Sequence, residues 1–380
     1  MIATPTIREV IAQLRAARLA SNPSLSDETQ LAADLFARAH RGDTTPWFVR
    51  ALVGWGAWIA ALMFLGFLAL VGILRTEQAA IGLGVILHGF ALATRRSDGG
   101  RGDFIGQLAL STNLLAQLLV IGGVSMLWKE SPHADALLTL LVCAYMVVVF
   151  PDRTQRFLSG AAFALALCFL FLPDRIFRYD FDPPSLGPGL RVCRELSLVA
   201  VAWLAGAALL VRHRSRRVLE IAIPAGFGLL VALFHLLAFA AVPGGWHELS
   251  ALLAGSITTA GIGGGVIVLE IHFLREKSIP LTARPALVAI GGTILMMIIA
   301  RDAPGILAAA GALLIGFRRG SALLMGLAAA FLCGFLGGFY YNLGATLLQK
   351  SIALSGGGAL LLGLRAYVVR TAPVRREEVA

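Results

Sequence analysis

The chain has 380 residues, of which 58% are hydrophobic and only 14% are charged, and its mean hydropathy is +0.80. A soluble domain is about 45–50% apolar and about 25% charged, so this composition excludes a large soluble protein and indicates that lipid surrounds most of the chain. The net charge of +10 would favour nucleic-acid binding in a soluble protein. In a membrane protein, Lys and Arg mark cytoplasmic loops instead, and we expect no nucleic-acid partner.

Residues 1–45 are polar and are predicted to form a cytoplasmic arm of amphipathic helices. Ile7, Val10 and Leu14 recur at helical spacing, and a second helix is predicted to begin after Ser24. Charged residues interrupt the arm throughout, so it does not resemble a signal peptide. Two roles stay open for it: an anchor that lies against the membrane, or a docking or regulatory hairpin.

From residue 51 onward, apolar runs alternate with short charged or turn-rich gaps, which predicts an all-α polytopic transmembrane helix bundle of about 12 spans. The predicted spans are 51–74, 78–94, 104–127, 135–150, 157–172, 196–211, 218–242, 249–274, 285–300, 304–317, 320–341 and 345–364. Span 304–317 is the weakest and fits a tilted helix, a re-entrant segment or part of a longer broken helix. The long outer loop 173–195 contains four prolines, which argue against a continuous helix there.

The distribution of Lys and Arg predicts the orientation of these spans. With the N-terminus in the cytoplasm, 24 of the 32 basic residues fall on the cytoplasmic side and 7 on the other, while Lys350 falls within the last span. This bias follows the positive-inside rule and supports an even number of spans, because a missed helix would invert every later loop. We therefore expect both termini in the cytoplasm, a transmembrane domain over 46–368 and a cytoplasmic tail over 369–380.

The familiar motifs of enzymes and cofactor-binding proteins do not occur in the sequence. The run from Gly261 to Val266 lacks the last glycine of a dinucleotide-binding loop, and there is no zinc-protease, serine-hydrolase or P-loop pattern. We therefore predict no catalytic residues, no metal site and no cofactor. None of the four cysteines belongs to a CxxC pair: Cys143, Cys168, Cys193 and Cys333.

Glycine is frequent, with 42 residues, which fits close helix packing in a bilayer. Two GxxxG pairs, Gly261 with Gly265 and Gly334 with Gly338, are predicted to allow neighbouring backbones to approach.

Ionisable and amide side chains inside the predicted spans are the candidate functional residues, because such groups are costly in a membrane. His88 lies near the middle of the second span, His235 in the seventh, and Glu270 near the inner end of the eighth. Asn113 and Gln117 share one helix face in the third span. Structural roles are the alternative: the histidines can donate to a carbonyl while neutral, the amides can join helices, and Glu270 can reach the headgroups.

Lys350 stands inside the last predicted span and is also a candidate site residue. A helix from Ser351 to Leu364 rises only about 21 Å, which is too short for about 30 Å of hydrocarbon. The helix is therefore predicted to begin near Thr346, with the ammonium below the outer interface. Two roles stay open: the side chain can snorkel towards the headgroups, or the buried cation can have a partner inside the bundle.

"PWFVRALVGWGAWIAALMFLGFL" begins with an aromatic residue followed by Val and Arg, and "FYYNLGATLLQKSIALSGGGALLLGLR" contains Tyr–Tyr–x–Leu and Leu–Leu–x–Lys–Ser. These two ends resemble a bacterial multi-pass family, domain-of-unknown-function family forty-four-oh-one, over about residues 46–368. Gly344 departs from it, since members commonly carry an acidic residue there. The matching residues are Trp47, Val49, Arg50, Tyr340, Tyr341, Leu343, Leu347, Leu348, Lys350 and Ser351.

The resemblance implies a location in the bacterial inner (plasma) membrane, in contact with membrane lipids. It also implies a complex with a small GDYXXLXY-motif membrane protein and a related multi-pass protein, without assigning an activity. We therefore expect a subunit of a small membrane complex. One alternative is a transporter of a small solute or lipid, which would favour an inverted repeat. Another is an intramembrane enzyme acting on a lipid-linked substrate, which would need polar groups that converge on one cavity.

Reporter fusions test the predicted topology. Fusions at Asp98, at Arg216 and at the C-terminus should all report the cytoplasm, while a fusion at Gly187 should report the opposite side, because the basic loops stay inside. A periplasmic C-terminus would contradict the even number of spans.

Overall fold

The computed structural model describes eight continuous stretches of the chain and five separate residues beyond them. They are 47–72, 76–97, 103–128, 131–171, 188–211, 215–241, 256–301 and 303–342, with Leu348, Ser351, Ser355, Leu362 and Ala366. The predicted arm at 1–45, nearly all of the predicted span 345–364 with Lys350, and the tail at 369–380 lie outside the described residues. The described elements are all helices, which confirms the predicted all-α class for this part of the chain.

Eleven helices are described. Their bounds are α3 (Trp47–Val71), α4 (Glu77–Ser97), α5 (Asp103–Leu127), α6 (Pro132–Val149), α7 (Arg153–Phe169), α8 (Pro188–Leu210), α9 (Arg216–Ala241), α11 (Ser256–Glu276), α12 (Arg284–Ile299), α13 (Pro304–Arg319) and α14 (Ala322–Asn342). Seven of them are long and apolar enough to cross a membrane, namely α3, α4, α5, α6, α8, α9 and α11. Helices α12 and α14 are also apolar but contain shorter apolar segments.

Each of the first eleven predicted spans coincides with one of these helices. The largest difference between a predicted and an observed helix boundary is at the start of α8. This helix begins at Pro188 and therefore includes residues that were assigned to the outer loop. A proline in the first helical position is compatible with a helix, because its missing N–H has no intrahelical partner there. The weak span 304–317 is a separate helix, α13, whose 16 residues are mostly buried. At about 1.5 Å per residue it rises about 24 Å.

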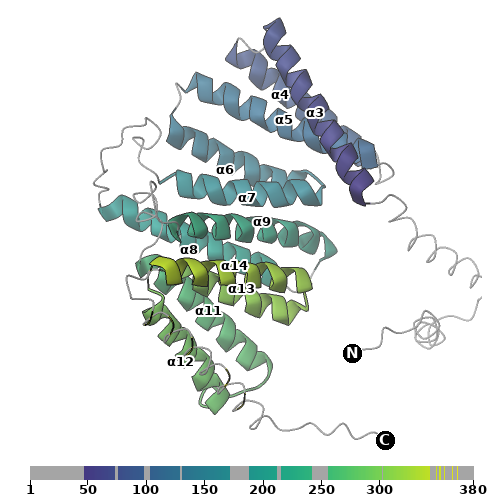
Figure 1. Ribbon diagram of the computed structural model, residues 1–380. Helices are drawn as coiled ribbons and strands as arrows, with labels where there is room; N and C mark the ends of the chain where they lie inside the picture. The colour runs from purple at the N-terminus through teal and green to yellow at the C-terminus, as the bar shows by residue number, and fades with distance from the viewer. Residues whose placement is uncertain are drawn as a thin grey trace, which may run out of the picture.

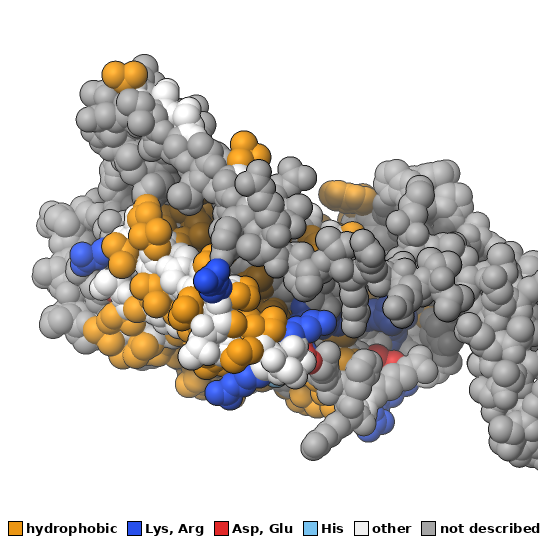
Figure 2. Space-filling view, turned by 90° about the horizontal axis from the view of Figure 1, so that it is seen from below, with side chains coloured by type: hydrophobic (Ala, Val, Ile, Leu, Met, Phe, Trp, Pro, Cys, Tyr) orange, Lys and Arg blue, Asp and Glu red, His pale blue; other side chains and the backbone are white. Residues whose placement is uncertain are grey.

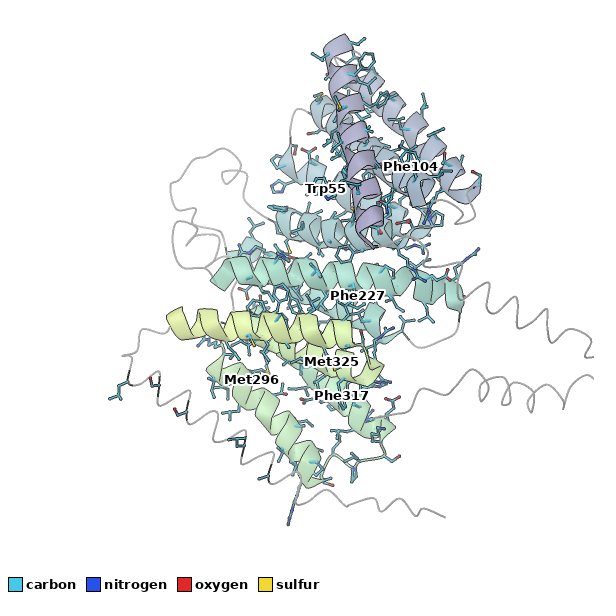
Figure 3. The ribbon with its side chains drawn as sticks, turned by 45° about the vertical axis from the view of Figure 1, so that its right-hand side comes forward. Trp55, Phe104, Phe227, Met296, Phe317 and Met325 are labelled. Carbon is cyan, nitrogen blue, oxygen red and sulfur yellow. The ribbon has the colours of Figure 1, made fainter. Side chains whose placement is uncertain are left out.

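The helices form two groups (Figure 1). Helices α3, α4 and α5 form the first group, which is inclined to the rest, and α4 packs along α5. The remaining helices form a larger group, in which α7, α8, α9, α11, α13 and α14 share a continuous apolar core that includes Leu198, Phe234, Leu307 and Leu324. The largest contact between the groups joins α5 to α6. In Figure 3, Trp55 and Phe104 mark the first group, and Phe227 and Met325 mark the second.

The outer surface of the described helices is largely apolar. Leu52, Leu70, Ile86 and Leu323 are among many large hydrophobic side chains that are exposed. On the face that is lowest in Figure 1, hydrophobic side chains dominate the coloured part, with Lys and Arg side chains among them (Figure 2). Because hydrocarbon is the solvent that accepts such a surface, the fold is compatible with an integral membrane protein.

Glycine allows the closest approach of two helices at the crossing of α7 and α9. A Cβ at Gly160 would overlap the carbonyl oxygen of Ala225, and a Cβ at Gly228 would overlap that of Phe157. The two backbones can therefore touch only where the side chain is a hydrogen atom. Neither Gly160 nor Gly228 belongs to a GxxxG pair in its own helix, so the sequence pattern does not reveal this crossing.

The two predicted GxxxG pairs differ in their surroundings. At Gly261 a Cβ would overlap Val199 of α8, and at Gly265 it would meet the indole of Trp203 at 3.1 Å, so this pair packs closely as predicted. A Cβ at Gly334 would have nothing within 4 Å. The prediction is therefore wrong for Gly334, which lies on an exposed part of α14.

Replacing Gly228 by Ala tests the close crossing of α7 and α9. Gly228→Ala should lower the free energy of unfolding by about 1–3 kcal/mol, because the new methyl group overpacks against backbone that cannot yield. The matched control is Gly291→Ala in α12, where a Cβ meets nothing within 4 Å. Thermal unfolding in detergent should show a lower midpoint for the first variant only; equal midpoints would contradict the crossing.

Candidate functional site

A chain of hydrogen bonds between polar side chains connects four helices in the first half of the molecule. Tyr145 of α6 contacts His88 of α4, with 3.2 Å between the hydroxyl and Nε2, and His88 Nδ1 lies 2.7 Å from Asn113 Oδ1 of α5. Asn113 Nδ2 donates to Gln155 Oε1 of α7 at 3.1 Å, and Gln155 Nε2 donates to Ser159 Oγ at 2.9 Å. These five residues are called the polar chain below.

The polar chain has one consistent direction of donation. Because Asn113 uses its amide oxygen towards His88, the ring must carry its proton on Nδ1. A neutral ring then has an unprotonated Nε2, which can accept the hydroxyl proton of Tyr145. Each member therefore donates towards Ser159, and the amide orientations and the histidine tautomer support one another. Such a chain suits interhelical attachment.

The polar chain is buried at its centre and exposed at one end. Asn113 and Gln155 are fully buried at 0% exposure, and Ser159 is buried at 2%. Tyr145 is 48% exposed, and its ring meets that of His88 edge to face at 5.6 Å between centroids. The chain thus runs from the outer surface of α6 to the interior of the bundle.

Asp152 places Gln155 in the polar chain. Its Oδ1 accepts from the backbone N–H groups of Thr154 at 2.8 Å and Gln155 at 3.0 Å, and so caps α7. Its Oδ2 forms an ion pair with Arg95 of α4 at 2.6 Å. One carboxylate therefore fixes the start of α7 and attaches it to α4, a few residues from the bond between Asn113 and Gln155. The ion pair and the polar chain both link the two helix groups.

Arg156 joins three helices next to this junction. Its Nε donates to the carbonyl oxygen of Val147 at 3.2 Å, and its Nη1 donates to that of Glu220 at 3.0 Å. Val147 lies in the last turn of α6, where carbonyls lack intrahelical partners and a cation is favoured. The guanidinium thus stabilises the end of α6 and holds α9 against α7.

The start of α11 is also capped by a side chain of a neighbouring helix. Glu195 of α8 accepts from the backbone N–H groups of Ile257 at 3.0 Å and Thr258 at 3.1 Å, at the start of α11. A carboxylate at a helix N-terminus satisfies donors that have no intrahelical partner. Thr259 Oγ1 donates to the carbonyl oxygen of Arg301 at 2.6 Å, beyond the end of α12.

Of the other predicted site residues, Lys350 lies outside the described residues, and Gln117 contacts the polar chain while Glu270 and His235 do not. Gln117 Nε2 donates to the backbone oxygen of Asn113 at 3.3 Å. Glu270 accepts from Thr293 Oγ1 of α12 at 2.7 Å, and His235 Nδ1 contacts its own helix at the Val231 oxygen at 2.7 Å. The structure therefore brings His88, Asn113 and Gln117 together, and it places Glu270 and His235 in two other locations.

An apolar cavity of about 410 Å³ lies between α8, α9, α11 and α13. His272 is the one lining residue with a titratable side chain among the described residues. The cavity contains no member of the polar chain, nor Gln117, Glu270 or His235. Small residues make room for it, including Ala202, Gly206, Gly265, Ala308, Gly311 and Ala312.

Possible metal ligands and cysteines lie apart from one another in the described part of the chain. No group of three or more His, Cys, Asp or Glu side chains lies close enough to hold a metal ion there. Cys143 and Cys168 are buried, Cys193 and Cys333 are exposed, and none forms a disulfide.

Sequence reasoning missed Gln155, Ser159 and the Arg95–Asp152 pair. The predicted span began at residue 157, so Gln155 was treated as part of a loop. The signal that could have found it is the sequence Asp152–x–x–Gln155, which resembles a capping box and predicts an earlier helix start. Gln155 and Ser159 then share one helix face at spacing i, i+4.

Comparisons with known proteins identify a family but no characterised relative. Residues 46–371 match the family model described as Domain of unknown function (DUF4401). No curated protein and no solved structure matches the chain significantly.

Replacing Asn113 by Leu should destabilise the junction of the two helix groups. The variant leaves His88 and Gln155 without their shared partner, and we expect a loss of about 1–2 kcal/mol, in the range of interhelical hydrogen bonds in membranes. The matched control is Gln117→Leu, which loses one bond to a backbone oxygen and should lose less. Thermal unfolding in detergent measures both, and a double-mutant cycle with Gln155→Leu should reveal coupling. Additive effects in that cycle would argue against the bond between Asn113 and Gln155.

Proposed function

The chain belongs to the DUF4401 family, and on this premise we propose that it is a subunit of a small membrane complex in the bacterial inner membrane. The observation that supports this role most is the exposed end of the polar chain at Tyr145. This side chain is 48% exposed on α6, a helix long and apolar enough to cross a membrane. Its hydroxyl oxygen keeps an acceptor site beyond the bond to His88, and a donor on another protein can fill that site whereas lipid chains cannot.

The surface around Tyr145 has the spacing of a helix-docking face. Leu137, Leu141 and Val148 are exposed on α6 together with Tyr145, and the four positions follow the helical spacing i, i+4, i+8 and i+11. The Tyr145 hydroxyl donates to His88, and its oxygen can still accept a bond from a donor on another helix. A partner helix would therefore find an apolar stripe with one polar contact at a fixed position.

We propose the small GDYXXLXY-motif membrane protein as the partner that covers this face. One exposed helix face offers room for a single partner helix, which suits a small membrane protein. The related multi-pass protein would be a further member of the same complex. Both partners come from the family resemblance, and the α6 face is the surface that the fold offers to the first of them.

An enzyme acting on a lipid-linked substrate and a transporter of a polar solute have less support from the described residues, whereas the apolar cavity is compatible with the other alternative, a transporter of a lipid. An enzyme or a transporter of a polar solute needs polar groups that converge on a cavity. The cavity between α8, α9, α11 and α13 is apolar, whereas the polar chain belongs to α4–α7. The polar groups there are engaged in joining helices, which is the behaviour of a scaffold subunit.

Photocrosslinking in cells tests the proposed docking face. With the photoreactive residue p-benzoylphenylalanine in place of Leu141, we expect a covalent adduct with the GDYXXLXY-motif protein, identified by mass spectrometry. The matched control carries the same residue in place of Ile298 of α12, which is 69% exposed on another face and should give no such adduct.

Tyr145→Phe separates the polar contact from the apolar one. Loss of the hydroxyl should lower the yield of copurified partner by roughly threefold to tenfold, which corresponds to one interhelical hydrogen bond. Lipid adducts alone at position 141, or equal protein adducts at 141 and 298, would contradict the proposal.

A further inference from the structure

The apolar cavity in the second helix group opens on the outer surface. Trp203, Ala207 and Val268 line it and are themselves exposed, so the cavity is a groove rather than an enclosed space. Trp203 is held in place because its Nε1 donates to the Gly261 oxygen at 3.1 Å. Three of the helices that form it, α8, α9 and α11, are long and apolar enough to cross a membrane. The groove therefore opens towards lipid hydrocarbon.

The length of the groove matches one leaflet of a bilayer. Along α11 its lining runs from Ile262 to His272, which is about 15 Å at about 1.5 Å per residue. The hydrocarbon of a bilayer is about 30 Å thick, so the groove extends over about half of it. Its volume of about 410 Å³ falls in the range of small-molecule sites, which is about 300–1,000 Å³. A single lipid chain fits these dimensions better than a protein helix about 10–12 Å across.

The His272 end of the groove is basic. Ile315 of α13 also lines the groove, and α13 ends in two arginines four residues later. Arg318 is paired with Glu276 at 2.7 Å, and its guanidinium lies 4.7 Å from the centroid of the Phe273 ring. Glu276 is the single carboxylate beside a larger number of cations on the α11–α12 turn and at the end of α13, namely Arg275, Lys277, Arg284, Arg318 and Arg319.

We propose that this groove binds one acyl chain of an anionic membrane lipid, with the lipid headgroup at the basic end. The apolar lining accepts the chain, and His272 with the surplus of cations accepts the phosphate. Basic pockets between membrane helices bind anionic headgroups in this way. The proposal concerns α8–α13 and does not depend on the partner proposed for α6.

Lipid titration of the delipidated full-length protein, followed by native mass spectrometry, tests the groove. The wild type should bind one phosphatidylglycerol at least about fivefold more tightly than phosphatidylcholine, the factor expected from one nearby cation. Gly206→Leu and Ala207→Leu place a side chain in the groove and should weaken both lipids by at least about tenfold, since displacing two buried methylene groups suffices for that factor. A Cβ at Gly206 is 4.0 Å from its nearest neighbour, Ile315, so the new side chain has room.

Two further variants separate the chain contact from the headgroup contact. Gly264→Leu is the matched control, because Gly264 does not line the groove and a Cβ there meets nothing within 4 Å; it should bind like the wild type. Arg275→Gln should lower the preference for phosphatidylglycerol by roughly fivefold and leave phosphatidylcholine unchanged.

Three results would overturn the proposal. The first is wild-type binding by both groove-filling variants when thermal unfolding shows that they are folded. The second is equal binding of the two lipids by the wild type, which would remove the assignment of an anionic headgroup. The third is a protein, rather than a lipid, that copurifies with the wild type and is released by the Ala207→Leu variant.

Discussion

In hydrocarbon a polar group has no water to bond, so the protein must supply each partner itself. Asn113 shows how the fold meets this constraint. Its side chain is fully buried, and it accepts from His88 and donates to Gln155. Three helices are thereby attached at one point. Apolar packing between helices gains little in lipid, because the acyl chains are as apolar as the side chains. Polar contacts therefore have a larger share in deciding which helices are neighbours.

The same constraint explains where the charges lie. Asp152, Arg156 and Glu195 each bind backbone groups at the end of a helix, where N–H or C=O groups lack intrahelical partners. Each of these side chains also contacts a second helix. Charges at the helix ends and the amides of Asn113 and Gln155 thus both attach helices to one another. Close backbone contact, as at Gly228, also holds neighbouring helices together.

Hydropathy and charge predicted the positions of eleven helices well, because the lipid environment acts on every residue of a span. The largest error, the start of α8, occurred at a proline, whose effect depends on its position within the helix. Pairing between helices was less predictable. The shared face of Asn113 and Gln117 was visible from their spacing, but the partner Gln155 depends on how α5 and α7 are placed in space. The spacing within one helix contains no information on that placement.

The two polar histidines show why a residue type alone does not identify a site. His88 joins a chain across four helices, whereas His235 bonds to its own helix and meets the Phe331 ring edge to face. Both looked alike in the sequence, as single histidines in apolar spans. What distinguishes them is the presence of a matching donor or acceptor on the neighbouring helix.

The surface proposed to bind a partner protein and the groove proposed to bind a lipid lie on different helices. The polar chain ends at the surface of α6, and the apolar groove opens between α8, α11 and α13. A lipid chain in the groove would cover apolar surface and needs a charge only where its headgroup lies. A partner helix on α6 can donate a hydrogen bond to the Tyr145 oxygen, which lipid chains cannot do. The chemistry of each surface therefore selects its own partner, and a lipid and a second protein can be bound without competing for one site.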